Sequence, residues 1–141
     1  MANTARVKWV GGTRMVGESG SGHAVVMEGM PGPDGVAVGI RPMEMLLLGM
    51  GGCTSIDVVM ILEKAREKVT DVVVEIEGER ADEIPKVYKR IHVHYVVTGH
   101  GLKDSAVARA AKLSAEKYCS ASVMMAAVAE VTHDYEIIEA S

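Results

Sequence analysis

The fold is decided by one apolar stretch, residues 42–68, which reads PMEMLLLGMGGCTSIDVVMILEKAREK. Pro42 suits the first turn of a helix, and Glu44 follows where the positive end of the helix dipole favours an acidic side chain. Apolar residues occupy most faces up to Glu63, which predicts a helix that is buried nearly all round. The glycine-rich segment 49–52 costs about 1 kcal/mol per glycine in a helix interior, so we expect another backbone to approach it closely.

Strand patterns lie on both sides of this helix. Residues 7–27 are rich in β-branched side chains and are broken by glycines, which predicts short antiparallel strands joined by turns. Apolar and polar side chains alternate in three later segments, as in strands with one buried face. These segments are residues 72–77, 90–97 and 132–138.

A second helical region separates the last two of these strands. Helical spacing runs from Leu102 to Lys117 and is interrupted at Cys119, after which we expect Ser120 or Ser122 to cap a shorter helix. We therefore predict an α+β fold, with antiparallel sheets packed on two central helices. The length fits a single domain spanning residues 1–141.

Composition excludes several classes of function. The formal net charge is −4, and nothing resembles the basic surface that nucleic-acid binding requires. The glycine-rich segment 49–52 has the spacing of an RNA-clamping G-x-x-G loop, but it is apolar and carries no cation. The N-terminal residues lack the apolar core of a signal peptide, and we expect no run of 18 apolar residues to span a bilayer. We therefore expect a cytoplasmic protein that binds neither nucleic acid nor membrane.

The two cysteines, Cys53 and Cys119, are the main candidates for chemistry. Cytosolic thiols are kept reduced, so a structural disulfide is not expected, and two cysteines alone do not complete a zinc site. Such residues are either inert parts of the core or a redox pair. In a redox pair, a helix N-terminus beside Cys119 or an arginine beside Cys53 would lower the pKa of the thiol.

Three segments resemble the OsmC/Ohr family of osmotically inducible and organic hydroperoxide resistance proteins. Pro42–Cys53 resembles the family's Pro-Glu-Glu-Leu…Ala-Ala-Cys segment, residues 114–120 resemble its second cysteine segment, and residues 131–136 resemble its closing strand. Within the family, the chain looks closest to the YhfA-type branch. The resemblance implies an OsmC-like fold in an intertwined homodimer, with each active site built from both subunits. It also implies a thiol-dependent hydroperoxide reductase in oxidative-stress defence, which uses no metal or other cofactor and is reduced by a lipoyl-type or small-molecule thiol.

The resemblance also assigns roles to individual residues. Cys53 takes the position of the peroxidatic cysteine and Cys119 that of the resolving cysteine. Arg14 is the nearest match to the arginine that stabilises the thiolate, and Glu44 to the glutamate that orients this arginine.

Two of these positions depart from the family pattern. Met43 stands directly after the proline, so Glu44 is displaced by one residue, or about 100° around a helix. Arg14 is offset by one residue from the glycine pair before it, and Arg41 and Arg80 are alternatives. Without these activators, the sequence favours a different class of protein: a non-enzymatic homodimer that binds a small apolar ligand. The ten methionines would line its cavity.

Other polar residues are predicted to be structural. His92 and His94 share one face of a strand, a spacing that metal sites use, but without a third ligand we expect a solvated sheet face. His133 receives the same interpretation. Asp57 and Glu63, on the Cys53 helix, are predicted to be capping or surface groups.

Overall fold

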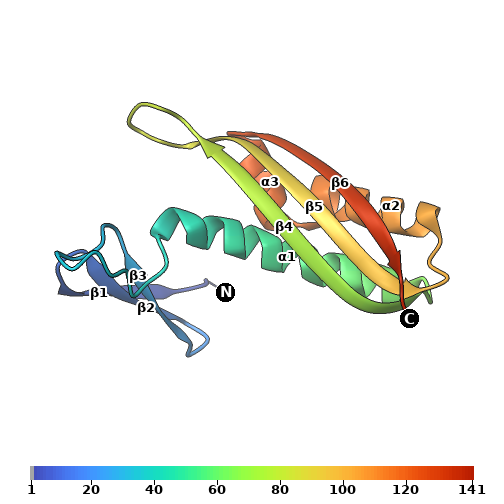
Figure 1. Ribbon diagram of the computed structural model, residues 1–141, viewed down its shortest axis with the longest axis horizontal. Coiled ribbons are helices and arrows are strands. Elements are labelled where there is room, and N and C mark those ends of the chain that lie inside the picture. Colours follow the sequence, from blue (N-terminus) through green and yellow to red (C-terminus); the bar gives the residue numbers. More distant parts are fainter. Residues whose placement is uncertain (1) are drawn as a thin grey trace. The chain divides into compact units, whose positions relative to one another are not determined.

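The computed structural model describes residues 2–141. The chain divides after Leu46 into two compact units, and the second is Leu47–Ser141. The first unit contains three strands, and the second contains three strands and the helices that pack on them (Figure 1). In chain order the elements are β1 (Ala5–Gly11), β2 (Arg14–Ser19), β3 (Ala24–Glu28), α1 (Pro42–Lys64), β4 (Lys68–Arg80), β5 (Tyr88–His100), α2 (Asp104–Leu113), the π-helical turn η1 (Ser114–Tyr118), α3 (Ser120–Ala126) and β6 (Glu130–Glu139). The division between the units falls within α1.

The first unit is an antiparallel meander in the order β1-β2-β3, as the sequence predicts. Gly11, the last residue of β1, and Gly12, in the turn to β2, have φ values of 116° and 54° that favour glycine. Arg14 begins β2 and lies opposite Glu28 at the end of β3. This register places the two side chains next to each other across the strands.

The sheet of the second unit has the order β4-β5-β6 and is mixed. β4 and β5 form an antiparallel pair, whereas β6 runs parallel to β5. The predicted α+β class is confirmed, but the prediction that every strand pair is antiparallel is wrong here. The reason is the helical connection from β5 to β6, because a crossover of this length returns the chain to the end of the sheet from which β5 started.

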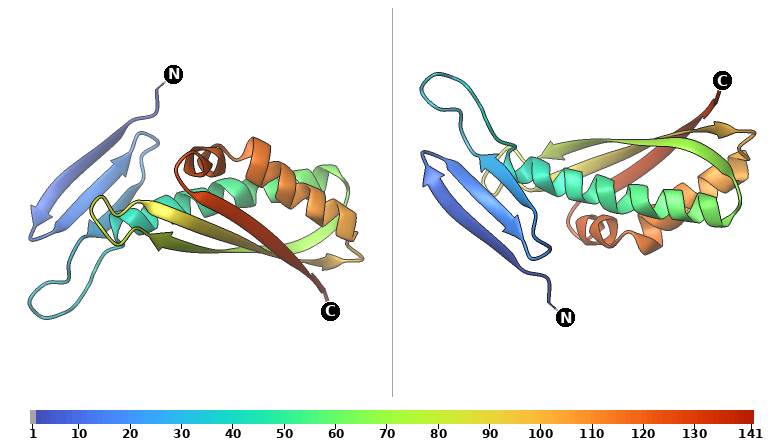
Figure 2. Two further views of the ribbon diagram at one scale, coloured as in Figure 1. Left: turned by 90° about the horizontal axis from the view of Figure 1, so that it is seen from above. Right: turned by 90° about the horizontal axis from the view of Figure 1, so that it is seen from below.

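All the helices of this unit lie on one face of its sheet (Figure 2). Along β5, four alternate apolar side chains are fully buried beneath the helices: Ile91, Val93, Tyr95 and Val97. From α1 they meet a single stripe of buried residues, Met50, Thr54, Val58 and Leu62. The prediction that α1 is buried nearly all round is therefore wrong within a single copy of the chain. The side chains of Leu48, Ile56 and Met60, on the other faces of the helix, are exposed.

Helix α1 runs without interruption through the glycine-rich segment. A Cβ added at Gly51 would lie 3.2 Å from the side chain of Ile76, whereas one added at Gly49 or Gly52 would meet nothing within 4 Å. The predicted close approach of another backbone is thus absent from the described residues. The helix also ends four residues before the predicted limit near Lys68, because Arg66 adopts a φ of 62° and the chain turns into β4.

By length and composition alone, α1 is apolar enough to cross a membrane, with a mean hydropathy of 1.9. The expectation that no segment passes this test is therefore wrong, because Asp57 is the only charge in the central part of the helix. The buried stripe described above packs this helix against the sheet of its own unit. That packing gives the apolar composition a role within the protein fold.

The connection after α2 sets the position of Cys119. The π-helical turn η1 closes with a hydrogen bond from the Cys119 amide to the Ser114 carbonyl, 2.9 Å long. Cys119 then becomes the N-cap of α3, and its sulfur accepts a hydrogen bond from the Ser122 amide at 3.3 Å. The prediction that Ser120 or Ser122 caps this helix is wrong, since the cysteine itself occupies the cap.

Candidate functional site

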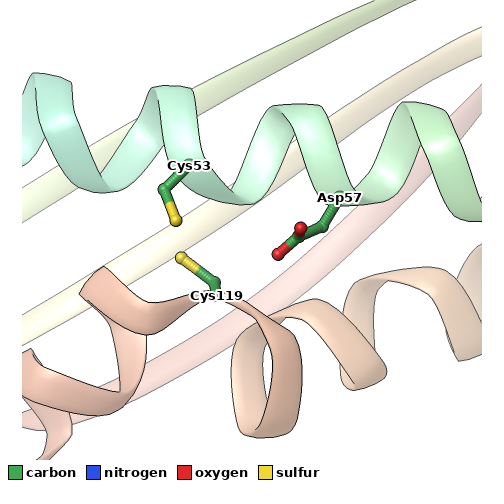
Figure 3. Close-up of side chains that lie close together, drawn as sticks. All are labelled: Cys53, Asp57 and Cys119. Carbon is green, nitrogen blue, oxygen red and sulfur yellow. The ribbon is translucent and has the colours of Figure 1, made fainter. Parts of the chain in front are cut away.

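The two cysteines face each other between α1 and the start of α3 (Figure 3). The sulfur atoms and a carboxylate oxygen of Asp57 all lie within 4.8 Å of one another. Both cysteines are free thiols; Cys53 is half-buried and Cys119 is fully buried. Packing of α1 against the η1–α3 connection thus brings together the two sequence segments that carry cysteine.

The surroundings of Cys119 hold its thiol in the protonated form. Burial raises the pKa of Cys119, and the negative charge of a neighbouring Cys53 thiolate raises it further. The nearby Ser122 hydroxyl and the Ser122 amide, which donates to the sulfur, oppose this rise. The predicted lowering of this pKa by a helix N-terminus is therefore outweighed. Cys119 is suited to act as a proton-bearing partner, which leaves the more accessible Cys53 as the candidate nucleophile.

Asp57 belongs to the site, so its interpretation as a cap or surface group is wrong. It follows Cys53 by one helical turn, and residues four apart share a face of a helix. The Ser114 hydroxyl donates a 3.0 Å hydrogen bond to Asp57 Oδ2. The spacing of Cys53 and Asp57 was the sequence signal for this contact.

A buried network of hydroxyl groups is linked to Asp57 through the Ser114 hydroxyl. Thr54 Oγ1 lies 2.6 Å from Tyr95 Oη and 2.6 Å from Ser114 Oγ, so these three side chains link α1, β5 and η1. Burial raises the pKa of Tyr95, which keeps its hydroxyl protonated and able to donate. Sequence periodicity placed Tyr95 on the apolar face of its strand but gave no sign that it meets Thr54.

A groove of about 650 Å³ has Asp57 among its lining residues. Apolar side chains and two cations, Lys64 and Arg109, line it. The remaining lining residues are Met60, Ile61, Ala65, Leu113 and Tyr118. Because Met60 is the one methionine among them, this groove does not match the methionine-lined cavity that the alternative interpretation expects.

Arg14 is paired with Glu28 inside the first unit. Arg14 Nε lies 3.0 Å from Glu28 Oε1, and Glu28 Oε2 accepts a 2.7 Å hydrogen bond from the Val38 amide. Glu28 is only 3% exposed. The Val38 hydrogen bond, together with Arg14, lowers the pKa of this carboxyl. Sequence reasoning missed Glu28, because its pairing depends on the register of β2 with β3.

Neutralising this buried acid should remove part of the acid sensitivity of the fold. The pKa of Glu28 is lower in the folded chain than the ordinary value of about 4.3. Above about pH 4.3 the ionised carboxylate therefore contributes its full amount to the free energy of unfolding. The contribution is lost as the pH falls through the lower, folded value. We therefore expect Glu28→Gln to lower the thermal unfolding midpoint at pH 7 and to reduce the further drop between pH 5 and pH 3. Glu18→Gln, at an exposed position, is the matched control, and an unchanged acid profile in Glu28→Gln would contradict the assignment.

Glu44 lies at the start of α1, where its carboxylate accepts a 2.9 Å hydrogen bond from the Arg41 amide. An acid at the third helical position that binds the capping residue's amide forms half of a capping box. The orientation of an arginine by Glu44 stays a prediction. Of the alternative cations, Arg41 contacts Glu44 through its backbone amide, and Arg80 Nε donates to the Lys86 carbonyl at 2.8 Å.

Removal of this capping contact should have a moderate effect on stability. We expect Glu44→Ala to lower the free energy of unfolding by about 0.5–1 kcal/mol, near the lower end of measured capping losses. Glu44→Gln keeps an acceptor and should retain most of that stability. Urea unfolding of the three proteins measures the difference. If Glu44→Ala left stability unchanged while slowing thiol oxidation, Glu44 would act on the cysteines and not on the helix.

The paired histidines of β5 lie on the open face of the second sheet, as predicted. His92 Nε2 and His94 Nδ1 approach the same Asp134 oxygen at 2.9 and 2.6 Å, and His94 Nε2 lies 3.3 Å from Glu136. The hydrogen bonds to Asp134 and then Glu136 raise the pKa of His94. His133 does not share this solvated face: it is half-buried, and its ring meets Tyr95 edge-on.

Comparisons with known proteins agree with this architecture. The chain is 48% identical over 136 residues to Protein YhfA of Escherichia coli strain K12, covering 96% of this chain and 98% of that protein. A hypothetical protein from Aquifex aeolicus VF5 has a similar structure, with a TM-score of 0.87 at 26% identity over 100% of this chain and 99% of that one. The organic hydroperoxide resistance protein OhrB of Bacillus subtilis shares the fold, with a TM-score of 0.65 at 16% identity over 96% of this chain and 98% of that one.

A family model completes these comparisons. The model described as OsmC-like protein matches residues 32–134, a region that includes α1, both cysteines and the first half of β6. This match and the relationship to Protein YhfA confirm the family that the cysteine segments predicted. The chain belongs to the OsmC-like protein family.

Proposed function

We propose that this protein reduces hydroperoxides, with Cys53 as the attacking thiol and Cys119 as the resolving thiol. The observation that supports this most directly is the approach of the two sulfurs within 4.8 Å of each other, from segments far apart in the chain. The raised pKa of Cys119 agrees with a resolving role, since a resolving thiol brings a proton to the second step. Hydroperoxide-related relatives in the same family support the choice of substrate.

The chemistry proceeds in three balanced steps. The Cys53 thiolate attacks the terminal peroxide oxygen, the O–O bond breaks, and the alkoxide takes up a proton to leave as an alcohol. This oxidises Cys53 to a sulfenic acid. The Cys119 thiol then displaces hydroxide from that sulfenic acid, which forms the Cys53–Cys119 disulfide and one water. A dithiol of the lipoyl type, or two small-molecule thiols, returns two electrons and two protons through thiol–disulfide exchange.

The proposal also includes an activating cation. A Cys53 thiolate would lie within 4.8 Å of the Asp57 carboxylate oxygen, where a nearby positive charge would stabilise it. We propose Arg14 for this role, with Glu28 holding its guanidinium group through the observed 3.0 Å contact. Glu44, the glutamate expected from the family pattern, keeps its capping contact in this proposal.

A single-turnover experiment tests the proposed reaction. Fully reduced, metal-free protein is mixed with one equivalent of cumene hydroperoxide per chain. We expect two thiols to be lost per chain, and peptide mass spectrometry to find Cys53 joined to Cys119. If both thiols remain several minutes after mixing, the proposal fails. A stable sulfenic acid on Cys53 without a disulfide would retain the peroxidatic role and remove the resolving role.

We further propose that two copies of the chain form the functional unit, in the cytoplasm, where thiols stay reduced. The exposed faces of α1 support this, because they carry Leu48, Ile56 and Met60, which a second copy would cover. Gly49 and Gly52 leave open space on the same helix for a close approach. The family match crosses the boundary between the two compact units, which supports the prediction of one domain, residues 1–141.

A charge on the exposed face of α1 should disrupt this association. We expect Ile56→Asp to convert the protein from dimer to monomer at micromolar concentration, because a carboxylate is costly to bury without a partner. Sedimentation velocity measures the change. Val73→Asp likewise replaces an exposed apolar side chain with a carboxylate, but on β4, and it should leave the dimer intact. A monomeric parent protein would rule out the homodimer.

A further inference from the structure

We propose that the reduced protein binds one Zn²⁺ ion through Cys53, Asp57 and Cys119. This inference goes beyond peroxide reduction and does not depend on it, since it concerns the reduced thiols in the absence of any oxidant. It follows from a donor set that two different elements bring together: two sulfurs and one carboxylate oxygen within 4.8 Å of one another (Figure 3).

The geometry requires little rearrangement. Tetrahedral zinc with Zn–S bonds of about 2.3 Å places its sulfur ligands roughly 3.8 Å apart. The three donor atoms already lie within 4.8 Å of one another, so rotamer adjustments of about 1 Å suffice to enclose an ion. Cys53 and Asp57 are one helical turn apart on α1, and Cys119 approaches from the N-cap of α3.

Neighbouring groups already hold two of the three ligands. The Ser122 amide donates to the Cys119 sulfur at 3.3 Å, and the Ser114 hydroxyl donates to Asp57 at 3.0 Å. Thr54 in turn fixes Ser114 at 2.6 Å. Hydrogen bonds of this kind orient metal ligands and strengthen binding. The buried Ser122 hydroxyl lies near the Cys119 sulfur without a well-formed hydrogen bond among the described residues, and a metal-bound thiolate would give it a stronger acceptor.

The charge of a divalent cation would account for the position of the Asp57 carboxylate beside two cysteines. Two thiolates and Asp57 would bring three negative charges together, whereas a divalent cation makes this arrangement favourable. Soft sulfur ligands with one oxygen ligand favour zinc over magnesium or calcium, and a two-sulfur copper(I) site would not need Asp57. Three protein ligands leave a fourth position for water, as in catalytic zinc sites. Asp57 also lines the groove described above, so one of the three proposed ligands borders a space that a small molecule could enter.

Binding and oxidation should exclude each other. Zn²⁺ binding converts two thiols to thiolates and releases two protons, with no change in oxidation state. The Cys53–Cys119 disulfide has no thiolate to offer, so oxidation should expel the ion. Conversely, the bound ion occupies the sulfur lone pair that attacks peroxide, and zinc should slow thiol oxidation.

The test uses the full chain, reduced and metal-free, without peroxide. Co²⁺ is titrated first because a thiolate–cobalt bond gives charge-transfer absorption in the near ultraviolet, and Zn²⁺ is then added to displace it. We expect one ion per chain and release of two protons per Zn²⁺. Cys53→Ser and Cys119→Ser should each weaken binding and reduce the charge-transfer absorption. His92→Asn/His94→Asn, which removes the histidines of the open sheet face, should leave both unchanged.

Asp57→Asn tests whether Zn²⁺ is bound by all three ligands or by the two cysteines alone. We expect it to weaken Zn²⁺ binding at least tenfold, at or above the loss of about 10–100-fold seen when supporting groups are removed. Asp57→Glu, which keeps a carboxylate, should recover part of the affinity and also serves if the asparagine variant does not fold. Equal affinity of Asp57→Asn and the parent protein, or the absence of thiolate absorption, would overturn the site.

The two proposals can fail separately. Disulfide formation with no zinc binding would leave peroxide reduction standing and reject the metal site. Zinc binding by thiols that do not react with peroxide would do the reverse.

Discussion

Replacing Cys53 with serine should reduce hydroperoxide consumption to the background rate, a loss of at least about 10³-fold, as expected when a nucleophile is removed. A serine hydroxyl in this position is neither ionised nor readily oxidised. Peroxide consumption with a dithiol reductant, followed over several turnovers, measures the effect. Persistence of more than a few per cent of the activity would show that another group attacks the peroxide.

Cys119→Ser is the matched variant, because it removes one thiol from the same pair. We expect Cys53 to be oxidised at nearly the parent rate in a single turnover, and then to remain as a sulfenic acid that dimedone traps. Multiple turnover should be much slower, since the disulfide that the reductant attacks cannot form. If Cys119→Ser instead lost the first oxidation, the roles of the two cysteines would be reversed.

Thr54→Val should cause the largest loss of stability among the single changes considered. Valine has nearly the shape of threonine but cannot bond to Tyr95 Oη or Ser114 Oγ, which lie 2.6 Å from Thr54 Oγ1. An orphaned buried polar group costs about 1–3 kcal/mol. Since Ser114 retains Asp57 as an acceptor, we expect a total loss of about 2–3 kcal/mol, mainly through Tyr95.

Urea unfolding at a fixed protein concentration measures this loss. Ser55→Ala on the same helix is the control, because that hydroxyl bonds only to the Gly51 carbonyl one turn earlier and should contribute little. A double-mutant cycle with Tyr95→Phe sharpens the test. Removing both partners should cost clearly less than the sum of the two single changes. Additive losses would mean that the Thr54–Tyr95 contact is energetically unimportant.

The sequence determined the features that depend on neighbouring residues. Pro42 and Glu44 marked the start of α1, and alternation in β5 identified its buried face. The segments around Cys53 and Cys119 identified the family, which the comparisons confirmed. These signals are readable because helix and strand periods, and the requirements of a helix end, act over a few residues.

Only the tertiary structure brought the cysteines within 4.8 Å of each other and placed Asp57 beside them. It also paired Glu28 with Arg14, joined Thr54 to Tyr95, and set β6 parallel to β5. These contacts depend on strand register, on the π-helical turn before Cys119, and on how α1 packs against the sheet. Each joins residues distant along the chain, and such contacts follow from the simultaneous packing of whole elements. Periodicity identifies a buried face, whereas packing decides which side chains meet there.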